Sequence, residues 1–229
     1  WIKYHYPAAF TAALLNAQPM GFWSPHTIIG DARRHGVVIR TPDLNQSAAT
    51  ATLEPDESST GGWAMRVGID YVRGIGEDLA EAIDAGRPYA SVEDLRRRVP
   101  KISLPILEAL ATSGAFGCFG IDRRSALWTA GAMAQTASDR LPGIVTGIDA
   151  PTLPGMSPQE LSHADLWATS VAPDGHPTKF IRENLVKRGV VTAKGLEDAE
   201  DGGRVTVGGV VTHRQLPATA SGTTFISLE

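Results

Sequence analysis

The stretch that decides the fold runs from Val67 to Ile83 and reads VGIDYVRGIGEDLAEAI. Apolar residues recur at helical spacing on both sides of a Gly-Ile-Gly turn, which predicts two short helices that share one apolar seam. The seam consists of Ile69 and Val72 before the turn and of Ile75, Leu79 and Ile83 after it. This arrangement is typical of a helix-hairpin-helix.

The turn itself is a candidate binding site. Gly74 and Gly76 flank Ile75, and glycine allows positive φ and the close approach of a ligand to the backbone. Amides at the start of the following helix lack intrahelical acceptors and carry the positive end of the helix dipole, so a phosphate can bind there without lysine. We expect the turn, from Arg73 to Glu77, to bind one nucleic-acid strand.

Two other interpretations of the turn stay open. It can be an ordinary tight turn between packed helices, or a nucleotide-type glycine loop. No strand is predicted directly before it, which weakens the nucleotide-type interpretation.

A second, degenerate hairpin is predicted over residues 99–103, VPKIS. It follows a capped helix start at Ser91 and precedes a helix from Ser103 to Ser113 that ends at Gly114. This copy lacks the Gly-x-Gly, and plain helical packing is the alternative. If the two hairpins pair, we expect Lys101 and the Ser103 helix start to contact the second strand of a duplex.

Length and composition set the class of protein. The 229 residues suffice for one large domain or two to three small ones, with the composition of a soluble globular protein. The single cysteine, Cys118, excludes an internal disulfide and a multi-cysteine zinc site, which fits a reducing cytoplasm. We expect it to be a core thiol rather than a catalytic one. No apolar run is long enough to span a bilayer, and no leader opens the chain. Because it starts with Trp1 rather than Met, we expect a piece of a longer protein.

Charge argues against a protein that binds DNA through electrostatics alone, because the formal net charge is −4. Basic residues do cluster at 33–35, 96–101, 123–124 and 187–188, and acidic residues at 54–57 and 197–201. Each cluster is interpreted first as solvated surface. The six histidines include no i, i+4 pair, the aspartates fit no metal spacing, and no serine has a recognisable His partner. The sequence therefore predicts neither a catalytic nor a metal site, and no cofactor in this chain.

The remaining segments predict a mostly α protein with a small β part. Residues 1–38 are expected to be helical, 48–60 an exposed loop, 124–135 a helix and 136–155 a linker. A capping box opens a helix at 157–160, and 179–187 is a short amphipathic helix. Residues 204–212 and 223–228 alternate like strands, and such a pair resembles the opening of a five-stranded OB barrel.

The order of these parts resembles the carboxy-terminal region of bacterial C-family DNA polymerase alpha subunits. The matching segments are residues 4–16 (YHYPAAFTAALLN), 31–37 (DARRHGV), 42–47 (PDLNQS), the hairpin, 107–116 (LEALATSGAF) and His176-Pro177. Residues 16–22 (NAQPMGF) and 214–219 (RQLPAT) resemble the error-prone, damage-inducible branch more than the main replicase.

The resemblance implies a modular division of the chain. Residues 1–60 would end the fingers domain, 61–125 would form a tandem helix-hairpin-helix DNA-binding domain, 126–200 a helical linker region, and 201–229 the truncated start of an OB-fold domain. Arg214 and Gln215 become candidates for single-strand contact. The family's Mg²⁺-dependent catalytic carboxylates lie in a palm domain that nothing here matches, so this piece is expected to bind rather than polymerise.

Two functions from different classes follow. In the first, the chain holds the primer–template duplex within a cytoplasmic, error-prone polymerase used in DNA repair and damage bypass. In the second, it is a platform for other lesion-bypass proteins with little direct DNA contact. The first is the expected function, and the net negative charge gives weight to the second, because an acidic piece approaches DNA against repulsion.

Overall fold

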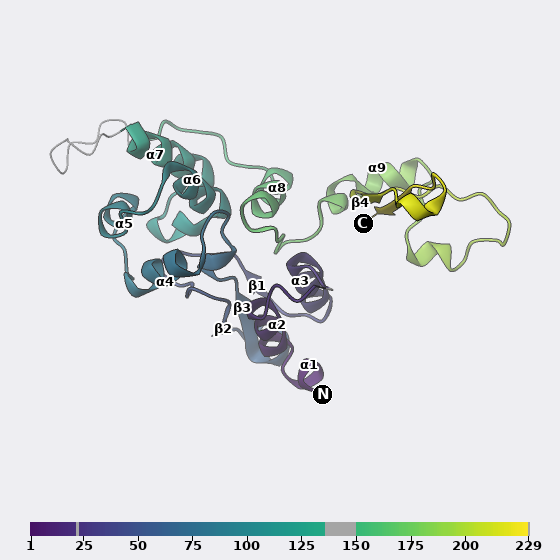
Figure 1. The fold of residues 1–229 in the computed structure, drawn as a ribbon, viewed down its shortest axis with the longest axis horizontal. Coiled ribbons are helices and arrows are strands. Elements are labelled where there is room, and N and C mark those ends of the chain that lie inside the picture. The colour runs from purple at the N-terminus through teal and green to yellow at the C-terminus, as the bar shows by residue number, and fades with distance from the viewer. Residues whose placement is uncertain (22, 136–149, 229) are drawn as a thin grey trace. The chain divides into compact units, whose positions relative to one another are not determined.

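The computed structural model describes residues 1–21, 23–135 and 150–228 (Figure 1). The chain forms two compact units, Trp1–Gly175 and His176–Glu229. Helices dominate and two small sheets accompany them, which confirms a mostly α protein with a small β part. None of the described helices has the length and apolarity needed to cross a membrane.

The first unit begins with three helices against a small sheet. These elements are α1 (Ile2–His5), α2 (Pro7–Asn16), α3 (Pro25–Arg34), β1 (Ile39–Arg40), β2 (Thr52–Pro55) and β3 (Trp63–Arg66). The sheet order is β1-β3-β2, with β1 parallel and β2 antiparallel to β3. Leu15, Ile29 and Met65 are buried between the helices and the sheet. The helical prediction for the start of the chain is confirmed up to Arg34.

The prediction of an exposed loop over residues 48–60 is wrong, and so is the absence of a strand before the hairpin. β2 lies inside the predicted loop, and β3 precedes the hairpin. The acidic composition of this segment suggested a solvent-exposed loop, but Glu54 is not free in solvent. It accepts hydrogen bonds from Arg66, which also donates to the Thr41 carbonyl. The helix that follows the glycine pair begins only at Glu77, so β3 does not form the direct strand–loop–helix unit of a nucleotide-binding loop.

The second half of the unit is a helical layer around the hairpins. It contains the 3₁₀ turn Ile69–Tyr71, α4 (Glu77–Ala85), α5 (Val92–Arg98), α6 (Leu104–Ser113), the 3₁₀ turn Ala115–Phe119, α7 (Arg123–Gln135) and α8 (Pro158–Thr169). The predicted seam residues Ile69, Val72, Ile75 and Ile83 are buried in one core, and Leu79 packs against it.

The helix predicted before the hairpin turn is only the single 3₁₀ turn Ile69–Tyr71. The cause is local: the amides of Ile69 and Asp70 donate to the carbonyls of Ala48 and Ala49. These hydrogen bonds fix the backbone beside the segment that leads into β2, and a longer helix does not form.

Predicted helix ends are confirmed elsewhere. The Ser91 hydroxyl accepts a hydrogen bond from the Asp94 amide at the start of α5, and Ser157 and Glu160 form the capping box of α8. Gly114 ends α6 in a left-handed conformation. Of the predicted linker, residues 136–149 lie outside the described part of the chain, as does Phe22; residues 150–157 form no helix or strand.

The second unit contains the 3₁₀ turn Pro177–Ile181, α9 (Arg182–Lys187), the 3₁₀ turns Lys194–Leu196 and Ala218–Ala220, β4 (Val211–Gln215) and β5 (Phe225–Leu228). β4 and β5 correspond to the two predicted strands, and they pair antiparallel. The first strand begins at Val211, later than predicted, because Gly208 packs against Val190 and Leu185, where a Cβ would lie 3.3 Å from Val190 Cγ1.

Gly114→Ala tests the end of α6. Its φ is +86°, and an added Cβ would lie 3.0 Å from Arg123 Nε, in a side chain held by an ion pair with Asp165. We expect a loss of about 1–2 kcal/mol in the free energy of unfolding, measured by urea denaturation. Gly117→Ala is the matched control, because nothing lies within 4 Å of its added Cβ and its φ is not positive. Equal stability of the two variants would contradict the argument.

Candidate nucleic-acid interface

The hairpin turn is anchored by one buried side chain between two exposed glycines. Ile75 is 6% exposed and belongs to the core, whereas Gly74 and Gly76 lie at the surface. The Ile75 amide donates to the Val72 carbonyl at 3.0 Å and closes the turn. Gly74 has a φ of +83°, which a residue with a side chain rarely adopts. The turn is therefore held from inside while its backbone faces solvent.

Three amides at the start of α4 are available to a ligand. The Gly76 carbonyl accepts from Leu79 and Ala80, which starts the helix. No intramolecular hydrogen bond from the amides of Gly76, Glu77 or Asp78 occurs within the described part of the chain. No atom lies within 4 Å of the position that a Gly76 Cβ would take. An anion can reach these amides and the positive end of the helix dipole.

The two predicted hairpins meet at one groove. A concavity of about 570 Å³ is lined by Gly74, Gly76 and the first turn of α4 on one side, and by residues 98–101 on the other. Gly74 also lies beside α6, since its added Cβ would be 3.6 Å from Ile106. The structure thus brings Lys101 and the Gly-Ile-Gly turn together.

The two basic residues that line the groove differ in whether their charge is already paired within the protein. Arg98 is committed internally: it donates to the carbonyls of Pro88 and Gly86 and packs over the Tyr89 ring at 4.8 Å. Lys101 is exposed, and none of the described acidic residues forms an ion pair with it.

Neither Ser103 nor Arg73, two of the predicted site residues, lines the groove. Ser103 is the exposed N-cap residue of α6, and its side chain makes no capping hydrogen bond. It is not among the groove-lining residues. The Arg73 guanidinium lies 5.0 Å from the centroid of the Trp167 ring, and its amide donates to the Ala168 carbonyl at 2.7 Å.

Acidic groups beside the amides set the local electrostatics. Glu77 and Asp78 are exposed in the first turn of α4, where carboxylates interact favourably with the helix dipole. Asp70, just before the turn, is partly buried, and its Oδ1 has no hydrogen-bond partner. Burial, with a smaller contribution from the charge of Glu77, raises the pKa of Asp70 to about 6.

The two candidates for single-strand contact belong to the second unit. Arg214 and Gln215 lie on β4, opposite Ile226 and Phe225 of β5, and both are exposed. The residues predicted from the sequence to contact DNA therefore belong to two separate units. Only the first unit contains the hairpin groove.

Several of the clustered arginines form ion pairs with nearby carboxylates, although Arg97 stays exposed at the surface. Arg97 pairs with Asp94, Arg124 with Glu160 and Arg123 with Asp165. Sequence reasoning missed Trp167, because its place beside Arg73 depends on contacts across more than ninety residues and no local pattern signals it.

Cys118 is not an activated nucleophile. It packs partly buried against the hairpin core, and burial raises the pKa of its thiol. A thiol with a raised pKa is less ionised and less reactive.

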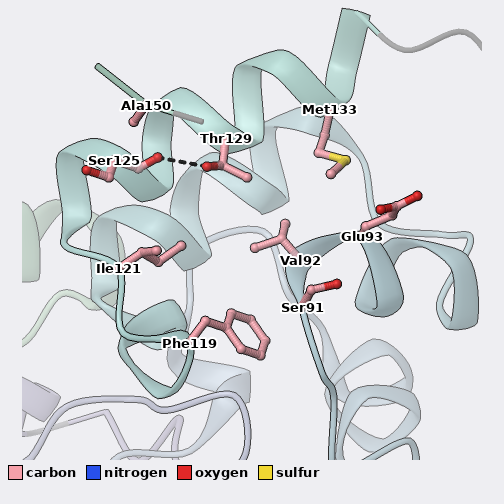
Figure 2. A pocket seen from close by; sticks show the side chains of 9 residues that line it. All are labelled: Ser91, Val92, Glu93, Phe119, Ile121, Ser125, Thr129, Met133 and Ala150. Atoms are coloured by element: carbon pink, nitrogen blue, oxygen red, sulfur yellow. Dashed lines mark hydrogen bonds between the residues drawn. The ribbon is translucent and has the colours of Figure 1, made fainter. Parts of the chain in front are cut away.

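A second cavity, of about 250 Å³, lies between α5 and α7 (Figure 2). Val92, Phe119, Ile121 and Met133 give it an apolar wall, and none of its described lining residues is a lysine or arginine. Figure 2 shows Thr129 bonded to its own helix, through the Ser125 carbonyl, rather than directed at a ligand. This cavity contains none of the predicted site residues, and its lining, as far as the structure describes it, offers no positive charge for a phosphate.

Comparisons with known proteins agree with the geometry. A family model described as a helix-hairpin-helix motif matches residues 36–126, which include both turns. The whole chain aligns with error-prone DNA polymerases from Mycolicibacterium paratuberculosis at 52% identity, Nocardia farcinica at 51% and Corynebacterium diphtheriae at 44%. The chain resembles error-prone DNA polymerases along its entire length. It spans about a fifth of those relatives, which it covers to 21%, 20% and 21%.

Asp70→Asn tests the electrostatics before the turn. A folded-state pKa of about 6, above the usual value of an aspartate, means that protonated Asp70 favours the folded state and that this contribution is lost as pH rises through about 6. Because Asp70 is partly solvated, we expect the variant to be more stable than wild type by about 1–2 kcal/mol at pH 7.5 and little different at pH 4.

Urea unfolding at the two pH values measures this difference. Glu81→Gln, at an exposed position on α4, is the control and should show no such pH dependence. A stability difference for Asp70→Asn that is the same at both pH values would contradict the assignment.

Proposed function

We propose that this chain is part of an error-prone DNA polymerase and that its hairpin groove binds the sugar-phosphate backbone of the primer–template duplex. One observation carries the proposal: the unpaired amides of residues 76–78 open onto the same groove as Lys101. The similarity to error-prone DNA polymerases over the full chain supports it.

Binding of this kind is independent of base sequence. Backbone amides and a lysine recognise phosphate oxygens, which every nucleotide carries, and read no base edge. The amides of the first hairpin would hold one strand, while Lys101 and the exposed Ser103 helix start would hold the other. A polymerase that moves along its product needs such contacts.

The other segments have proposed roles in the same enzyme. We assign residues 1–60 to the end of the fingers domain, 61–125 to the tandem hairpin domain, 126–200 to a helical linker region and 201–229 to the start of an OB domain. Arg214 and Gln215 would contact single-stranded template. Mg²⁺-dependent phosphoryl transfer is assigned to the part of the polymerase outside this chain, and cytoplasmic DNA repair to the whole enzyme.

A platform for other lesion-bypass proteins is the second candidate. The formal net charge of −4, with Glu77 and Asp78 at the groove itself, favours it over strong electrostatic binding of DNA. The two functions differ in one measurable property, because only the first requires duplex binding that weakens as salt rises.

Gly76→Val tests the amide contact without disturbing the fold. Gly76 has a φ of −92° and open space around its missing Cβ, so valine fits the backbone but covers the neighbouring amides. Gly74→Val would strain the backbone at φ +83°, so a loss of binding by that variant could reflect a change in the fold. We expect Gly76→Val to weaken duplex binding by about 1–3 kcal/mol, equally for unrelated DNA sequences, in fluorescence anisotropy titrations.

Gly155→Val is the matched control, because this glycine also has open space around its added Cβ and lies outside both hairpins. Equal affinity of Gly76→Val and wild type would exclude the amide contact. Failure of the wild-type chain to bind duplex DNA at any salt concentration would favour the interaction platform.

Lys101→Gln tests the second strand contact. Loss of one phosphate-bound lysine should weaken binding for all sequences and reduce the slope of log K against log salt by about 1. The slope is measured from affinities between low and physiological salt. Lys3→Gln is the control, because Lys3 pairs with Asp31 at 2.7 Å on a helix outside the groove. An unchanged slope for Lys101→Gln would remove this lysine from the interface.

A further inference from the structure

Arg73 is unlike the other arginines near the hairpins. In the described residues its guanidinium forms neither an ion pair nor a hydrogen bond, and its one recorded contact is with the ring of Trp167, 5.0 Å from the centroid. Arg66, Arg87 and Arg98, by contrast, donate to carboxylates or carbonyls. The exposed charge of Arg73 directly precedes the Gly-Ile-Gly turn.

An aromatic partner leaves a guanidinium free to bind something else. A carboxylate would occupy its N–H groups, whereas a ring covers one face of the guanidinium plane and leaves the N–H edge available. Stacking also restricts the side chain, so less conformational entropy remains to be lost when those N–H groups bind a phosphate.

The helix that carries Trp167 is held in place by packing and by an ion pair. Trp167 lies on α8, which packs against α6 and is anchored by Asp165, 3% exposed, whose Oδ1 lies 2.7 Å from Arg123 Nη2. Beyond the helix, Val171 is fully buried in the core beneath the sheet. The Ala168 carbonyl accepts the Arg73 amide, so α8 fixes both the backbone and the side chain of Arg73.

We propose that Trp167 is a positioning residue of the duplex-binding surface: its ring holds the Arg73 guanidinium beside the hairpin amides, so that both contact the same DNA backbone. The inference rests on the proposed function and extends it, because it makes α8 a third element of a site otherwise built from two hairpins. Trp167 then acts through Arg73.

A double-mutant cycle on the 229-residue chain tests this dependence. The affinity for a labelled duplex of arbitrary sequence is measured at fixed salt for wild type, Arg73→Gln, Trp167→Leu and the double variant. We expect Arg73→Gln to weaken binding roughly ten-fold, and Trp167→Leu about two- to five-fold. Trp167→Leu should cause no further loss in the Arg73→Gln background.

Two further variants separate positioning from packing. Trp167→Phe keeps an aromatic face, so its affinity should lie between those of wild type and Trp167→Leu; it also carries the test if the leucine variant fails to fold. Trp128→Leu is the control, since Trp128 and Trp167 are both 47% exposed. It should bind like wild type, and thermal melting should show that all variants are folded.

The inference is overturned if Trp167→Leu binds like wild type, or if it causes the same fold-loss with and without Arg73. It is also overturned if Trp167→Phe loses as much affinity as Trp167→Leu. Gly76→Val is measured in the same assay to separate failure of this inference from failure of the proposed function. If Gly76→Val binds weakly while Trp167→Leu binds like wild type, only this inference is overturned. If Gly76→Val binds like wild type, the proposed function itself is overturned.

Discussion

The burial of one side chain between two exposed glycines is the constraint on which the site depends. Ile75 is fixed in the core that α4 to α7 share, so the turn cannot move without opening that core. The flanking glycines contribute no side chain, and their amides therefore stay open to solvent. Apolar packing of Ile75 fixes the position of the turn, and the two glycines leave its backbone accessible. Within these three residues, one side chain therefore serves stability and the other two positions serve binding.

Electrostatics in the first unit serve folding more than binding. The arginines that cluster in the sequence are largely paired with nearby carboxylates, as Arg97 is with Asp94 and Arg123 with Asp165. Such pairs add little net positive potential at the surface. The groups that stay available to an anion are few and local. They are three amides at the start of α4, one exposed lysine and one arginine that contacts a tryptophan ring.

Local patterns predicted the hairpin seam, the helix caps at Ser91 and Ser157 and the β4–β5 pair, because each depends on neighbours a few residues away. The sheet was missed because Glu54 looks like a solvent residue until its partner Arg66, twelve residues on, is known. The place of Trp167 depends on the docking of α8 and had no sequence signal. Non-local pairing explains both failures.

Glu77 and Asp78 show what the proposed backbone-binding role requires of an acidic chain. They stabilise the start of α4 through its dipole, but they also compete with a phosphate for the same positive end. Under the proposed function, the groove would bind a phosphate against this local repulsion, and each contact would be weak. A clamp made of several weak, sequence-independent contacts holds a duplex through their number while letting any one of them break and reform one nucleotide further along. Net negative charge is thus compatible with a backbone-binding role, provided that amides rather than a basic surface make most of the contacts.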